Sequence, residues 1–111
     1  MRLLETVING TSLSWKQGSN TYNVPYGTSK YLEIGFTFSD EWEPFKKVVC
    51  FKSGNNELYM PIINNKCSIP DSITNGEVKF SFKVIGMNKD TKVLTNFLEV
   101  RQVNYEWVTI H

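Results

Sequence analysis

A chain of 111 residues is long enough for one hydrophobic core and too short for two ordinary domains, so we expect a single domain over residues 1–111. With 41% hydrophobic and 21% charged residues, the composition is that of a folded protein and excludes a largely disordered one. Twelve basic and eleven acidic residues leave a net charge of +1, and the lysines are spread along the sequence. Because no strong overall field results, we expect neither nucleic acid nor a membrane as a partner.

The first half of the chain alternates apolar and polar residues with period two, which predicts β-strands. The predicted strands cover residues 3–8, 12–15, 21–24, 31–38 and 47–52. Asn9-Gly10 between the first two strands is a strong hairpin-turn signal. The run from Val48 to Phe51 is apolar on both faces, which predicts a central strand of a sheet.

The second half continues the same pattern. Its predicted strands cover residues 57–63, 77–85, 92–103 and 105–110, and the short segment 66–69 ends at Pro70. Asn64-Asn65 predicts a turn, Gly86 to Asp90 a loop, and the change of register at Thr95-Asn96 a bulge or bend. A single helical turn is expected at residues 71–74. About eight or nine short strands predict an all-β fold, an antiparallel two-sheet β-sandwich of the jelly-roll or immunoglobulin-like type.

The N-terminal residues resemble the start of a signal peptide, but Glu5 interrupts the apolar run and no small-residue cleavage site follows. We therefore expect a protein that is not secreted by a signal peptide and that folds in a reducing cytoplasm. In that compartment Cys50 and Cys67 are expected to be free thiols, and both lie in or beside apolar strand segments.

The sequence offers no catalytic group in a recognisable setting. The only histidine is the terminal His111, so no obvious base stands ready for a serine or cysteine nucleophile. Glycines are scattered rather than gathered in a phosphate-binding loop, and two distant cysteines with one histidine make a poor zinc set. We expect no enzyme, no cofactor and no metal.

An acidic cluster surrounds Trp42, with Asp40 and Glu41 before it and Glu43 after it. Carboxylates beside an aromatic residue occur in glycosidases and sugar sites. The alternative interpretation, which we favour, is a solvated acidic loop with Trp42 folded back onto the core.

Several short motifs recur together in one known group of sequences. They are Phe38-Ser39-Asp40-Glu41-Trp42, Phe45, Val49-Cys50-Phe51, Cys67-Ser68-Ile69-Pro70, Val84-Ile85-Gly86 and Leu94-Thr95-Asn96. This order resembles the small β-sandwich domains of structural proteins from tailed phages and prophages of Gram-positive bacteria, including baseplate and upper-baseplate components. The resemblance extends from Tyr31 to Val100, and the first thirty residues do not share it.

The resemblance implies a virion structural protein of the baseplate, tail or head-decoration type that assembles with copies of itself or with other virion proteins. It implies a location in the virion or in the bacterial host cytoplasm. Trp42 and Phe45 would close one end of the sandwich, with Pro44 at the corner, and Gly86 and Asn96 would supply turn or bulge geometry.

Two further functions fit the same residues. One is a small phage-encoded protein that binds and inhibits a host defence or regulatory protein. The other is a carbohydrate-binding module that stacks sugars on Trp15, Trp42 or Trp107. For protein partners, the candidate interaction surface comprises Trp42, Tyr105 and Trp107.

Overall fold

The computed structural model describes residues 2–18, 21–25, 31–74 and 79–103. Within them the strands are β1 (Arg2–Asn9), β2 (Ser12–Trp15), β3 (Thr21–Pro25), β4 (Leu32–Phe38), β5 (Lys46–Ser53), β6 (Asn56–Pro61), β7 (Lys66–Ser68), β8 (Lys79–Met87), β9 (Lys92–Leu94) and β10 (Leu98–Val103). A 3₁₀ turn, η1 (Asp40–Trp42), and one helical turn, α1 (Asp71–Thr74), complete the elements. No helix in these ranges has the length and hydropathy needed to cross a membrane.

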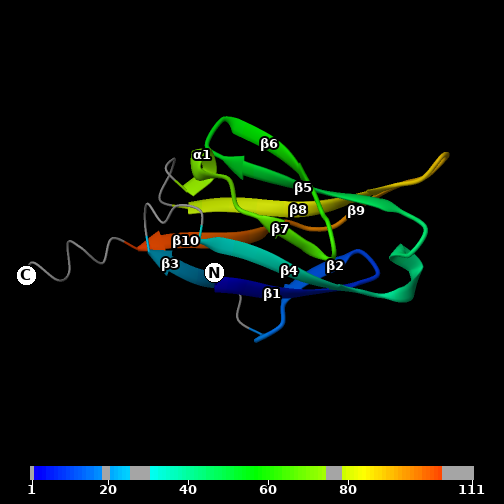
Figure 1. Ribbon diagram of the computed structural model, residues 1–111, viewed down its shortest axis with the longest axis horizontal. Helices are drawn as coiled ribbons and strands as arrows, with labels where there is room; N and C mark the ends of the chain where they lie inside the picture. Colours follow the sequence, from blue (N-terminus) through cyan, green and yellow to red (C-terminus); the bar gives the residue numbers. More distant parts are fainter. Residues whose placement is uncertain (1, 19–20, 26–30, 75–78, 104–111) are drawn as a thin grey trace, which may run out of the picture.

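The strands form two sheets packed face to face (Figure 1). One has four strands in the order β2-β1-β4-β7. The other has six, in the order β3-β10-β8-β5-β6, with β9 pairing with the end of β8. The expected all-β two-sheet sandwich is therefore confirmed.

The pairing is mixed rather than wholly antiparallel. Strand β1 pairs with β4 in parallel, and β3 pairs with β10 in parallel. After β2 the chain passes to β3 in the other sheet and only then returns to β4, which gives the long connection that parallel neighbours require. Alternation of period two is the same in both kinds of pairing, so the sequence pattern could not distinguish them.

Alternating side chains of the two sheets meet in one core. Leu32, Ile34 and Phe36 of β4 are buried, as are Phe80 and Phe82 of β8, as the alternation predicted. Burying each such side chain contributes about 1.5–3 kcal/mol to folding. The core therefore forms along the shared inner faces of the sandwich.

Two turn predictions are confirmed in detail. Gly10 follows β1 with a φ of 64°, which its lack of a side chain permits. Asn64 and Asn65 both have positive φ, 55° and 59°, and the flanking Ile63 and Lys66 exchange two backbone hydrogen bonds across the turn. Asparagine tolerates this left-handed conformation better than most residues.

The predicted strand over residues 92–103 is divided at the position where its register changes. Strand β9 ends at Leu94 and β10 begins at Leu98. Between them the Asn96 side chain accepts a hydrogen bond from Leu13 N at 2.8 Å and donates one to Leu13 O at 2.9 Å. The break in β-structure thus ties the six-stranded sheet to the edge strand β2 of the other sheet.

The predicted loop over residues 86–90 begins later than expected, because Gly86 and Met87 still belong to β8. Gly86 pairs with Lys47 on one side and with Val93 on the other. Packing, and not a turn, requires glycine at this position, because a Cβ on residue 86 would lie 2.6 Å from Cζ3 of Trp42.

Candidate interaction surface

Trp42 lies inside the protein and not on its surface. Its side chain is 1% exposed, and its Nε1 donates a hydrogen bond to the carbonyl oxygen of Gly10 at 2.7 Å. The ring centroids of Phe38 and Phe45 lie 5.5 and 6.0 Å from that of Trp42. The prediction that Trp42 belongs to the contact surface is therefore wrong. Tyr105 and Trp107 lie outside the described residues.

The acidic cluster around Trp42 is the solvated loop that we favoured. Asp40, Glu41 and Glu43 are exposed, and Glu41 Oε1 accepts a hydrogen bond from Ser39 Oγ at 3.0 Å. The carboxylates stay in water because the chain turns Trp42 inward, where its large apolar ring is favoured.

The candidate sugar-stacking residues are also withdrawn from solvent. Trp15 is 2% exposed and packs edge-on against Phe82, with ring centroids 5.6 Å apart. Neither Trp15 nor Trp42 presents a ring face to a carbohydrate, and Trp107 is outside the described part of the chain.

Cys50 and Cys67 are free and buried, as predicted. Burial raises the pKa of the Cys67 thiol to about 12, with a smaller contribution from the charge of Glu33. Burial also raises the pKa of Cys50. Both thiols are protonated at neutral pH, so neither provides the thiolate that nucleophilic or redox chemistry needs. Among the described residues no three histidine, cysteine or acidic side chains gather as a metal site, and His111 lies outside them.

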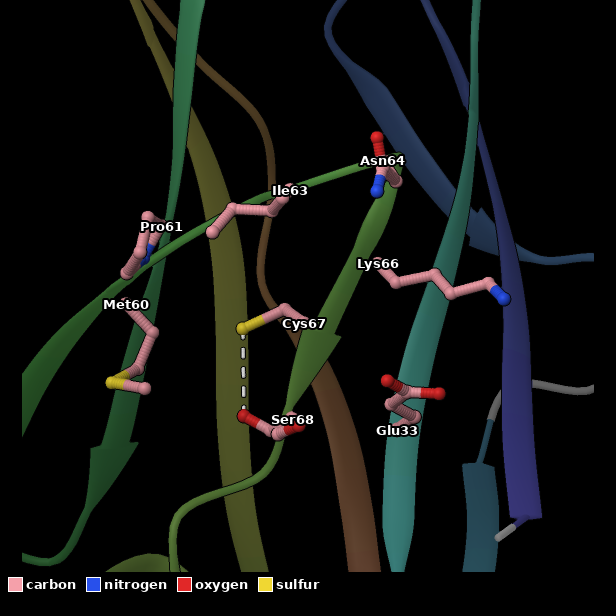
Figure 2. Close-up of a pocket in the computed structure, with 8 residues that line it drawn as sticks. All are labelled: Glu33, Met60, Pro61, Ile63, Asn64, Lys66, Cys67 and Ser68. Atoms are coloured by element: carbon pink, nitrogen blue, oxygen red, sulfur yellow. Dashed lines mark hydrogen bonds between the residues drawn. The ribbon is translucent and has the colours of Figure 1, made fainter.

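A cleft of about 350 Å³ opens between β6 and β7, the edge strands of the two sheets. Figure 2 shows Met60 and Pro61 at one side and Glu33 and Lys66 at the other. The thiol of Cys67 donates to the carbonyl oxygen of Ser68 at 3.5 Å and is engaged within the wall (Figure 2). The cleft offers a mixed apolar and polar groove without an activated nucleophile.

The outer face of the six-stranded sheet is a second candidate interaction surface. Four of the seven large apolar side chains that are exposed among the described residues occur here: Tyr59 at 54%, Met87 at 45%, Leu94 at 44% and Phe97 at 43%. Strand register places less exposed apolar residues between them. We call the set Val48, Tyr59, Ile85, Met87, Leu94 and Phe97 the outer-face patch.

The register makes the patch continuous across four strands. Val48 of β5 lies between Pro61 of β6 and Ile85 of β8, and Ile85 pairs in turn with Leu94 of β9. Two residues further along β5, Cys50 lies between Tyr59 of β6 and Lys83 of β8. Apolar side chains therefore form a band that crosses the sheet.

Charged residues border this band. On one side Met87 pairs with Lys46 and Lys92. Within it the Nζ of Lys83 lies 4.9 Å from the centroid of the Phe97 ring, a cation–π contact that holds both side chains on the surface. We call Lys46, Lys83 and Lys92, the lysines that lie beside or within the apolar band, the basic frame of the patch.

Sequence reasoning did not find this patch. Its members come from β5, β6, β8 and β9 and from the segment before β10, and each alone appears as an ordinary outward position in its strand. The apolar outer face of the run from Val48 to Phe51 was the available signal, but we assigned it to burial in a central strand. Only the pairing register brings the residues together.

No known protein family matches the chain, and no curated protein matches it.

Proposed function

We propose that this chain is a non-enzymatic structural protein of a phage or prophage virion, of the baseplate, tail or head-decoration type, that works by binding other proteins. The observation that carries protein binding is the outer-face patch. Apolar side chains gathered on one exposed face are typical of interaction sites, whereas single exposed ones are ordinary. The location that follows is the virion or the bacterial host cytoplasm.

The virion setting is supported by the order of motifs between Tyr31 and Val100, which resembles small domains of phage structural proteins. The raised pKa values of the two buried thiols argue against thiolate chemistry at Cys50 and Cys67. The partners are copies of the chain or neighbouring virion proteins.

The test is sedimentation with phage particles. An epitope-tagged chain is produced in cells that release particles, and these are purified on a density gradient and probed for the tag. We expect the chain to sediment with the particles in a fixed ratio to the major virion proteins. A chain that is absent from particles, and that light scattering finds monomeric at every concentration, contradicts the proposal.

A second candidate function is inhibition of a host defence or regulatory protein. The basic frame of the patch favours it, because lysines on one copy would repel those on another and a different protein is the better partner. It is distinguished by a host protein that is recovered in a stoichiometric complex from cells that contain no particles.

A further inference from the structure

The outer face of the six-stranded sheet carries a charge that differs from that of the whole chain. Its outward charged positions are Lys46, Lys52, Glu57, Lys79, Lys83, Lys92, Glu99 and Arg101. Six are basic and two are acidic, so this face carries a net charge of +4 while the whole chain carries +1. The rest of the sequence therefore has a net negative charge, and the basic excess lies on the sheet face that carries the outer-face patch.

The two acidic residues of this face are already engaged. Glu57 Oε1 accepts a hydrogen bond from the Tyr59 hydroxyl at 2.5 Å, and Glu99 forms an ion pair with Lys79 at 3.6 Å. Lys46 and Lys92, which border Met87, are exposed and have no opposite charge across the strand register. Lys46 and Lys92 are therefore available to interact with a partner.

This charge distribution argues against a second copy as the occupant. In a symmetric dimer the same face would meet itself and oppose basic side chains to basic side chains. Like charges placed against each other across an interface are costly, whereas complementary charges favour encounter and register.

Resting on the protein-binding function proposed above, we infer that the outer-face patch binds a different protein whose contact surface has apolar side chains surrounded by aspartate and glutamate. Leu94, Met87 and Phe97 supply the apolar contact, and Lys46, Lys83 and Lys92 pair with the partner's carboxylates. The cleft between β6 and β7 takes no part in this contact.

The test uses a displayed library of random peptides, selected on the wild-type chain and then measured as synthetic peptides. The selected peptides are expected to combine Asp and Glu with Leu or aromatic residues. Two variants address the patch: the apolar pair Met87→Ser/Leu94→Ser and the charge reversal Lys46→Glu/Lys92→Glu, in which both lysines are exposed. Ile63→Ser is the matched control, since Ile63 is 65% exposed and lines the cleft instead.

Each patch variant is expected to weaken peptide binding by about tenfold or more, the size of effect found at interface hot spots. Ile63→Ser is expected to leave it within about twofold, and raising salt from about 0.05 to 0.5 M is expected to weaken the wild-type interaction. Urea unfolding of each variant checks that it remains folded, and because the charge reversal alters only exposed groups it keeps the test valid if the apolar pair unfolds.

Three results would overturn the inference. The first is recovery of no binder, or of binders without an acidic excess. The second is binding that Ile63→Ser weakens and the patch variants do not. The third is a dimer in solution that Met87→Ser/Leu94→Ser dissociates, which would make a second copy the occupant. Sedimentation of wild-type chain with particles is a separate readout, so the virion function can stand or fall independently.

Discussion

Trp42 occupies the space in which any residue other than glycine at position 86 would place its Cβ. That Cβ would lie 2.6 Å from Cζ3 and 3.0 Å from Cε3 of the indole ring. The ring itself is fixed by the hydrogen bond from its Nε1 to Gly10 O and by its contact with Phe45. The two residues together close the end of the sandwich next to the outer-face patch.

Gly86→Ala is expected to lower the free energy of unfolding by about 1–3 kcal/mol, the usual cost of overpacking a core. Urea unfolding followed by Trp fluorescence measures it. Gly35→Ala is the matched control, because the three atoms nearest to its Cβ would all belong to the Leu3 side chain, at 3.1 to 3.2 Å. Leu3 is 37% exposed and free to shift, so this variant is expected to stay within about 1 kcal/mol of wild type. Equal losses in both variants would contradict the fit.

Asn96 joins the two sheets through its two hydrogen bonds to the backbone of Leu13. Asn96→Ala is expected to lower the free energy of unfolding by about 1–3 kcal/mol, because the N–H and carbonyl of Leu13 lose their partners. Asn96→Asp retains the acceptor for Leu13 N but places a carboxylate against Leu13 O, so it too is expected to destabilise. A neutral effect of both substitutions in urea unfolding would show that this link does not stabilise the sandwich.

The Cys67 thiol is expected to make the folded chain less stable as the pH rises above 9.0. Its pKa rises from 9.0 to about 12 in the folded chain, because burial disfavours the thiolate. Between these values the unfolded chain has released the proton and the folded chain has kept it, so the free energy of unfolding falls as pH rises. Cys67→Ser removes this contribution, and the difference between wild type and variant is expected to change above pH 9.0 and to be constant below it. A pH-independent difference would contradict the raised pKa.

The Tyr59 hydroxyl has its pKa raised to about 12, chiefly because it donates a hydrogen bond to the carboxylate of Glu57. Glu57→Gln is expected to lower that pKa toward 10.0, the ordinary value for tyrosine. Absorbance titration of the variant against wild type, with Tyr59→Phe to identify the signal, measures the shift. An unchanged pKa in the variant would contradict the hydrogen bond between the Tyr59 hydroxyl and Glu57.

The sequence predicted the strands and the inner face well, because burial imposes alternation on each strand separately. Phe80 and Phe82 are examples, since their neighbours point outward and the pattern reveals the core directly. It did not predict the parallel pairing of β1 with β4, which depends on the route of the chain between sheets. The role of Gly86 was missed for a related reason, because the ring that requires it comes from a distant segment.

The candidate site was harder to predict than the fold. Two interpretations of Trp42 stood side by side: a ring folded back onto the core at the end of the sandwich, and a contact residue. The first is confirmed and the second is wrong, because the ring is buried. Leu94 and Tyr59 gave no sign of belonging together, since a single exposed apolar residue is common on any surface. Their shared face follows from the register of β5, β6, β8 and β9 and cannot be read from composition.

The outer face of the six-stranded sheet is the surface that we expect a partner protein to cover. The most direct measurement is acetylation of lysines in lysate of cells that produce the chain naturally, compared with the purified free chain. We expect Lys83 and Lys92 to be protected in the lysate, while Lys16 and Lys66 on the four-stranded side react equally in both samples. Protection of Lys16 and Lys66 alone, or equal reactivity of all four lysines in both samples, would contradict the claim.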